Sequence, residues 1–172
     1  MRGDQKTTIR KTNRITIELA PVATEEVRAL ISELDLILAA EYQPEQRHGL
    51  PLDAIFNPEI RLFLARLDGA PVGCAGVALF ADFAEVKRMY VREAVRGRGV
   101  AQALLARIES EALKAGLVLL RLETGDRQAA ALRFYRRAGF ERRAPFGAYA
   151  AMAPHAIATS LFLEKRLPPQ DL

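Results

Sequence analysis

The sequence is poor in the residues that build cross-links and metal sites. Its 172 residues include one cysteine, two histidines and no tryptophan. Cys74 alone cannot close an internal disulfide, and His48 and His155 lie too far from it along the chain for zinc-ligand spacing. We therefore predict no metal and a reducing, cytoplasmic location.

Long hydrophobic runs are absent as well. The longest apolar stretch, residues 70–81, is well short of the roughly 20 residues that cross a bilayer. Residues 1–13 are polar and lack the apolar segment of a secretory signal, so they are predicted to form a flexible leader. The chain length then favours one domain, over residues 14–168, with no membrane partner.

The sequence also has little excess of charge of either sign. The 25 basic and 21 acidic residues leave a net charge of only +4. The arginines that stand out occur in a compact loop and not along one long face. We therefore expect no nucleic-acid partner.

The hydrophobic pattern predicts an α/β domain with a mixed sheet. Apolar residues recur at every second position in some segments and at every third or fourth position in others. Asp68-Gly69 is typical of a hairpin turn. The irregular segments are 43–59, with one helical turn at 52–56, and 144–156. The expected strands are 15–19, 63–67, 71–80, 85–91, 117–122 and 159–163, and the expected helices begin after Thr24, near Gly99 and before Ala131.

A loop rich in glycine and arginine joins the predicted strand 85–91 to the next helix. At a helix N-terminus the first amides lack partners within the helix, and glycines without Cβ let a ligand oxygen approach the backbone. The arginines add positive charge, so the loop is predicted to bind a pyrophosphate; the alternative is a glycine turn with solvated arginines. No GK[ST] follows, which excludes a P-loop. The residues are Arg96, Gly97, Arg98, Gly99, Val100 and Ala101.

Two motifs in this part of the chain carry a family resemblance. Arg96-x-x-Gly99-x-Ala101 resembles the Q/R-x-x-G-x-G/A acetyl-CoA motif of the GNAT superfamily of N-acetyltransferases. Downstream, Gln128-x-x-Ala131-x-x-Phe134-Tyr135-x-x-x-Gly139-Phe140 is similar to that family's N-x-x-A-x-x-FY-x-x-x-GF segment. The resemblance covers roughly residues 14–165.

The resemblance implies the family's fold, cofactor and reaction. The mixed sheet would be splayed between its fourth and fifth strands, with flanking helices, to admit the pantetheine arm of acetyl-CoA. The backbone of Met89, Tyr90 and Val91 would pair with the pantetheine amides. Gln128 replaces the usual asparagine, which alters that contact with the cofactor.

The implied reaction is attack of an amine on a thioester, and two glutamates compete for the role of general base. An alkylamine with a pKa near 10.4 needs about 4.6 kcal/mol to lose its proton at pH 7. Glu85 and Glu123 each match a base position in one branch of the family; otherwise Glu85 pairs with Lys87 and Glu123 with Arg121. We expect Glu85→Gln to cost more activity. Tyr135, from the FY pair, is the candidate acid that protonates the leaving thiolate, or else a core aromatic.

Acceptor specificity is expected from the loops after the first helix and near the end of the chain. The candidates that would contact the acceptor are Tyr42, His48, Phe146 and Tyr149. Together with Glu45 and Asp53, they suit a small cationic amine. The acceptor itself could be a small molecule or a peptide, and the chain could form a homodimer. The alternative function is a non-catalytic acyl-CoA sensor.

Overall fold

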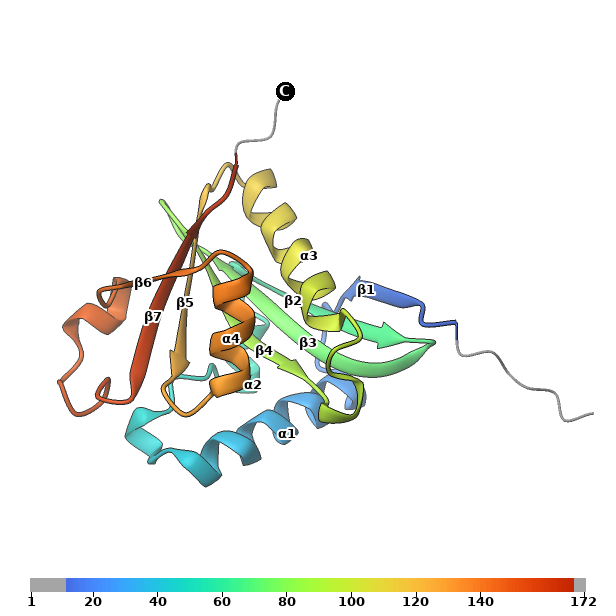
Figure 1. The fold of residues 1–172 in the computed structure, drawn as a ribbon, viewed down its shortest axis with the longest axis horizontal. Helices are drawn as coiled ribbons and strands as arrows, with labels where there is room; N and C mark the ends of the chain where they lie inside the picture. The colour runs from blue at the N-terminus through green and yellow to red at the C-terminus, as the bar shows by residue number, and fades with distance from the viewer. Residues whose placement is uncertain (1–11, 169–172) are drawn as a thin grey trace, which may run out of the picture.

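The computed structural model describes residues 12–168, which form seven strands and four α-helices (Figure 1). The predicted leader, residues 1–13, lies almost wholly outside this range. The helices are α1 (Glu25–Glu41), α2 (Leu52–Ile55), α3 (Val100–Lys114) and α4 (Ala129–Arg137), and the strands are β1 (Ile15–Leu19), β2 (Ile60–Leu67), β3 (Ala70–Leu79), β4 (Ala84–Val91), β5 (Leu119–Gly125), β6 (Glu141–Arg143) and β7 (Ser160–Arg166).

The strands form one mixed sheet in the order β1-β2-β3-β4-β5-β7-β6. Every neighbouring pair is antiparallel except β4 and β5. These two parallel strands pair only through Ala84 with Leu120 and Glu85 with Arg121, and then diverge. The predicted mixed α/β fold, splayed between the fourth and fifth strands, is confirmed.

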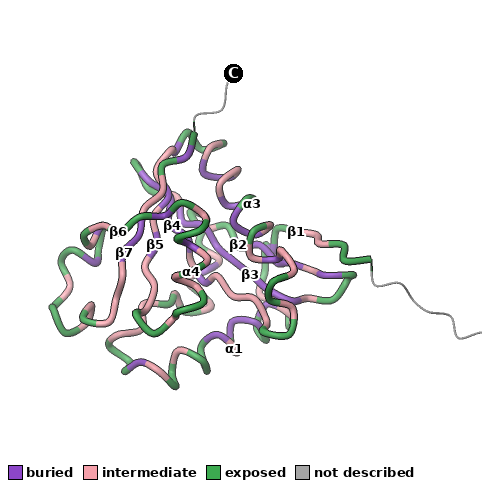
Figure 2. Tube along the Cα trace, in the orientation of Figure 1, coloured by how far each residue is buried: buried purple, intermediate pink, exposed green. Residues whose placement is uncertain are grey.

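The sheet is covered on both faces because its central strands are apolar on both. Along β2, Phe63 and Ala65 belong to the core cluster that includes α3, whereas Leu62 and Leu64 belong to the cluster that includes α1. Period-two alternation therefore places α1 and α3 on opposite faces. Figure 2 shows the buried segments concentrated in the central strands and in parts of α1 and α3.

The ends of the helices follow from local chemistry. Thr24 accepts a hydrogen bond from the amide of Val27 and caps α1. Gly99 precedes α3 and Gly116 follows it, both in the left-handed region. Gly139 adopts the same conformation after α4, as its predicted position at the helix end requires.

The irregular segments contain short elements that periodicity did not predict. Pro44–Gln46, Glu93–Val95 and Gly147–Ala151 are 3-10 helices, and β6 is a three-residue strand on the edge beside β7. Such lengths hold less than two periods of any pattern. No helix within residues 12–168 is long and apolar enough to cross a membrane.

Candidate active site

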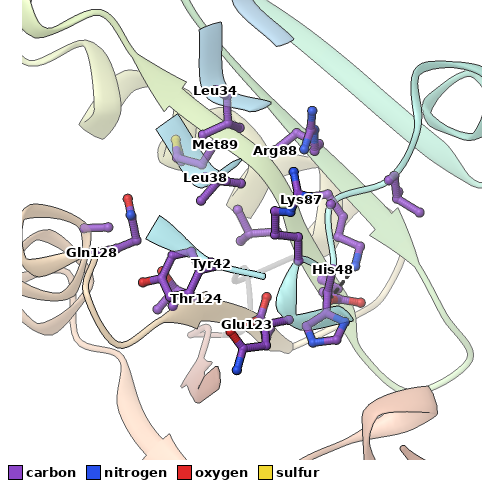
Figure 3. Close-up of a pocket in the computed structure, with 18 of the residues that line it drawn as sticks. Leu34, Leu38, Tyr42, His48, Lys87, Arg88, Met89, Glu123, Thr124 and Gln128 are labelled. Atoms are coloured by element: carbon purple, nitrogen blue, oxygen red, sulfur yellow. Dashed lines mark hydrogen bonds and ion pairs between the residues drawn. The ribbon is translucent and has the colours of Figure 1, made fainter. Parts of the chain in front are cut away.

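A cavity opens where β4 and β5 separate, between α1 on one side and α4 on the other (Figure 3). We call it the central cavity. Segments far apart in the sequence meet there, including the loop after α1 and the 3-10 helix at 147–151. The residues predicted from the sequence that line it are Tyr42, His48, Glu85, Met89, Glu123, Gln128, Tyr135 and Tyr149.

A β-bulge in β4 shapes the wall of the cavity. Between the pairs Cys74–Tyr90 and Gly76–Lys87, β4 has one residue more than β3. Arg88 lies at this bulge with φ +54°, a left-handed conformation that is uncommon for a residue with a side chain. Beyond Glu85 no strand of the described chain pairs with the β5 side of β4. The backbone of Met89, Tyr90 and Val91 thus lies along an open sheet edge.

Glu85 lies at the closed end of the splay and is already engaged. Its Oε1 accepts hydrogen bonds from Lys87 Nζ at 2.9 Å and from the Tyr149 hydroxyl at 2.7 Å. Lys87 Nζ also donates to the Tyr149 hydroxyl at 2.8 Å, which closes a triangle of three polar groups. Glu85 is only 3% exposed. The pairing with Lys87 that the sequence offered as an alternative is therefore present.

Glu123 faces the same cavity from β5. Desolvation raises the pKa of its carboxyl, and the nearby charge of Glu85 raises it further, while the Ser160 hydroxyl and then His48 and Lys87 oppose the shift. Figure 3 shows His48, Lys87 and Glu123 gathered at one end of the cavity. Arg121, the partner considered from the sequence, instead binds Glu164 at 2.6 Å. Glu123 is thus a partly buried carboxyl that lines a cavity, with a pKa above its usual value.

Tyr135 reaches the cavity from α4 and is that helix's only buried residue. Its ring packs edge-on against Phe134 and Phe140. Burial alone raises the pKa of its hydroxyl, so the phenol stays protonated at neutral pH. The side chain is therefore both a packing residue and a protonated group at the cavity wall.

The loop before α3 has the geometry that anion binding requires. Gly97 and Gly99 have φ values of +79° and +87°, and the first intrahelical bond runs from Ala103 N to Gly99 O. The amides at the start of α3 are therefore without helical partners. A Cβ on Gly97 would meet no atom within 4 Å, so the backbone conformation, and not crowding, favours glycine there. The loop thus presents unpaired backbone amides, as the predicted pyrophosphate site requires.

The positive charge near this loop is smaller than the sequence indicated. Lys87 pairs with Glu85, Arg88 with Asp35 at 2.6 Å, and Arg92 with Glu33 at 2.7 Å. The acidic partners of the two arginines lie on α1, far away in the sequence. Of the arginines in the loop itself, Arg96 Nε donates to the carbonyl of Val91 and Arg98 Nε to Asn13 Oδ1.

We expect Gly99→Glu to weaken acetyl-CoA binding at least tenfold, which is about 1.4 kcal/mol. The change adds negative charge at the helix N-terminus and places a side chain at φ +87°. Calorimetric titration measures the affinity. Gly116→Glu, with φ +77° at the opposite end of α3, is the matched control for backbone strain and should bind normally. Unchanged affinity in folded Gly99→Glu would remove this loop from the cofactor site.

The predicted acceptor residues lie in different environments. His48 Nε2 lies 2.8 Å from the carbonyl oxygen of Ala156, and its ring packs edge-on against Tyr149. The Tyr42 hydroxyl accepts a hydrogen bond from the amide of Arg127 at 2.8 Å. Phe146 is absent from the cavity wall because it packs behind it, against Tyr149 and other aromatic rings.

Gln128 precedes α4 and links it to α1. Its Nε2 donates to the carboxylate of Glu41, the last residue of α1. Lys87, Arg47 and Arg88 also line the cavity but were not identified from the sequence as site residues. Residues two apart in a strand share a face, so the sequence did place Lys87 beside Glu85. This was the one sequence signal for any of the three residues.

We expect Gly125→Ala to destabilise the fold by about 1–3 kcal/mol through overpacking. A Cβ at this position would lie 2.2 Å from the hydroxyl oxygen of Tyr42, which is buried against the β5–α4 connection. Thermal unfolding measures the loss. In the Tyr42→Ala variant, Gly125→Ala should lower the stability much less. An equal loss of stability in the wild type and in this variant would contradict the steric explanation.

Comparison with known proteins gives the class of the molecule. The model of the "Acetyltransferase (GNAT) family" matches residues 29–140. A solved structure from Klebsiella pneumoniae, assigned as an acyl-CoA N-acyltransferase, superposes with a TM-score of 0.73 at 31% identity, covering 91% of this chain and 99% of that one. The chain belongs to the GNAT family of acetyltransferases, and it is an acyltransferase with acetyl-CoA as co-substrate.

Two relatives cover most of the chain. The IAA acetyltransferase of Azospirillum brasilense is 42% identical over 155 residues, which are 89% of this chain and 98% of the relative. The aminoalkylphosphonate N-acetyltransferase of Salmonella typhimurium is 32% identical over 127 residues, which are 69% of this chain and 79% of the relative. These similarities favour an enzyme over the non-catalytic sensor.

Proposed function

We propose that the protein transfers the acetyl group of acetyl-CoA to a primary amine by direct attack within a ternary complex. The observation that carries the proposal is the central cavity, where an open sheet edge, a partly buried carboxyl and a protonated phenol meet. The Salmonella relative, by its name, acetylates an amine. The acceptor is a small molecule or a peptide.

The open edge of β4 would hold the donor. Pantetheine amides would pair with the backbone of Met89, Tyr90 and Val91 as an added strand does, and the pyrophosphate would bind at residues 96–101. An amide of the β4 edge would stabilise the oxyanion that forms when the amine attacks. The Gln128 side chain, bound to Glu41, would orient the entrance to α4.

Glu123 is the better candidate for the general base, in contrast to our expectation from the sequence. Glu85 would have to release Lys87 or Tyr149 from Oε1 before that oxygen could accept a substrate proton. Glu123 is partly buried, and its raised pKa brings it closer to the range in which a base works at neutral pH. We therefore assign proton removal to Glu123 and the positioning of Lys87 and Tyr149 to Glu85.

Tyr135 is the proposed acid. When the tetrahedral intermediate collapses, the carbon–sulfur bond breaks and the thiolate takes a proton from the phenol. Burial keeps that phenol protonated until the step occurs. The attacking nitrogen must lose a second proton to become an amide, and this proton restores the Tyr135 phenol. The proton that Glu123 removed from the ammonium leaves by exchange with solvent after the product departs.

An acyl-cysteine route is disfavoured by the position of Cys74. The thiol is buried in β3 and contacts the carbonyl of Arg88, and burial raises its pKa to about 12. A thiol at such a pKa is almost entirely protonated at pH 7 and is a weak nucleophile. Direct transfer needs no covalent intermediate on the protein.

The test is incubation of the protein with acetyl-CoA and a panel of primary amines. Release of free thiol together with an acetylated amine, identified by mass, is the expected result. Initial rates measured against both substrates should give intersecting lines, as a ternary complex requires. Parallel lines, or loss of activity in Cys74→Ala, would indicate an acyl-enzyme, and thiol release without an acetylated amine would refute the transferase assignment.

A further inference from the structure

The wall of the central cavity carries more basic than acidic side chains. Its two carboxylates are Glu85 and Glu123, and its lysine and arginines are Arg47, Lys87 and Arg88. We call the part of the wall formed by these three basic residues and His48 the basic end. Arg47 and His48 come from the segment between α1 and α2, and the other two from β4. Glu45 and Asp53, whose charge favoured a cationic acceptor, are exposed and do not line the cavity.

The charges of the basic end are unequally balanced. Lys87 is paired with Glu85, and Arg88 with Asp35. Among the ion pairs of residues 12–168, none involves Arg47, and its buried Nε has no hydrogen-bond partner. The central cavity therefore contains one arginine whose charge the described chain does not neutralise.

Arg88 provides a second unused donor beside this charge. Its side chain is only 4% exposed, and its terminal nitrogen binds Asp35, yet its Nε is buried without a partner. The β-bulge holds the residue at φ +54°, which directs a long basic side chain into the wall between β4 and α1. Buried donors without partners are uncommon because each lost its bonds to water on folding.

We propose that the acceptor carries an anionic group, a carboxylate or a phosphonate, that binds Arg47 with Arg88 beside it, while its amine faces Glu123. The inference rests on the proposed transferase function and specifies its substrate class. A guanidinium presents parallel N–H groups that match such an anion with two hydrogen bonds. The anion would neutralise the unpaired charge of Arg47, and an acceptor without an anion would not.

The experiment compares acceptors of matched length with and without the anion. Wild-type protein is assayed with 3-aminopropanoate, 2-aminoethylphosphonate and propylamine, and kcat/KM should be at least tenfold higher for one or both anionic acceptors. The better of the two identifies the anion. Arg47→Gln should remove this preference, chiefly by raising KM for the anionic acceptor, and should lower kcat/KM for propylamine much less than for the anionic acceptor.

Two further variants separate charge from folding. Arg47→Lys keeps the charge without the planar fork and should retain part of the preference. Arg28→Gln removes an exposed arginine on α1 that bonds the carbonyl of Ala23, and it should behave as wild type. Acetyl-CoA affinity and melting temperature of each variant show that the fold and the donor site are intact.

The outcomes distinguish this inference from the function on which it rests. Equal kcat/KM for charged and neutral acceptors in the wild type, or an equal loss for all three acceptors in Arg47→Gln and Arg47→Lys, would overturn the anionic acceptor while leaving the transferase in place. Absence of acetylation of every amine in the wider panel would overturn both.

Discussion

Glu123→Gln is expected to lower kcat/KM by about 10²–10⁴-fold at pH 7, the usual contribution of a general base. The wild-type profile should be flat between the raised pKa of Glu123 and the pKa of the amine, because the carboxylate removes the proton within the complex. The glutamine of the variant cannot remove this proton, so only acceptor molecules that are already neutral amines react. The variant's kcat/KM should then rise about tenfold per pH unit toward the amine's pKa near 10.4.

Glu85→Gln is the matched control, the same isosteric change in the same cavity. Its profile should keep the wild-type shape, because the base is still present. Its melting temperature should fall, since Lys87, whose side chain is only 14% exposed, loses its charged partner. If Glu85→Gln instead produces the pH-dependent loss and Glu123→Gln does not, the two assignments are reversed.

Tyr135→Phe is expected to lower kcat by about 10–1,000-fold, because it removes one proton donor. The substitution keeps the ring that packs on Phe134 and Phe140, so acetyl-CoA affinity and melting temperature should remain close to wild type. Single-turnover kinetics with calorimetry and thermal unfolding measure the three quantities. The loss should appear in the chemical step alone.

Two results would contradict the role of Tyr135. Full activity in Tyr135→Phe would mean that the thiolate leaves without help from this residue. A large fall in melting temperature with a proportionate loss of activity would show that the hydroxyl stabilises the fold. As a comparison, Tyr149→Phe removes a hydroxyl from the Glu85 triangle and should disturb the cavity without abolishing transfer.

The helices and strands were predictable where a pattern repeats several times. The apolar stripe of α1 extends over more than two periods, and β2 and β3 are apolar runs on either side of the Asp68-Gly69 turn. The splay between β4 and β5 was not readable from periodicity, because a gap in pairing leaves no local pattern; it came from the resemblance carried by residues 96–101 and 128–140. The three residues of β6 were too few for any periodic signal.

The candidate site was less predictable because it depends on contacts between distant segments. Lys87, Arg88 and Arg92 come shortly before the phosphate loop in the sequence, yet the structure pairs the two arginines with acidic residues of α1. The bulge at Arg88 breaks the alternation on which face assignments along β4 rely. Arg47 lies in an irregular segment whose path no sequence pattern describes, so its position in the cavity could not be foreseen.

The gap between β4 and β5 also bears on product release. In the proposed complex, backbone groups of β4 hold acetyl-CoA by its pantetheine arm. Acetyl transfer does not change this part of the cofactor. Free coenzyme A keeps that arm and its pyrophosphate, so it should bind nearly as well as the thioester. Turnover would then depend on how fast spent coenzyme A leaves, and its cellular ratio to acetyl-CoA would set the working rate.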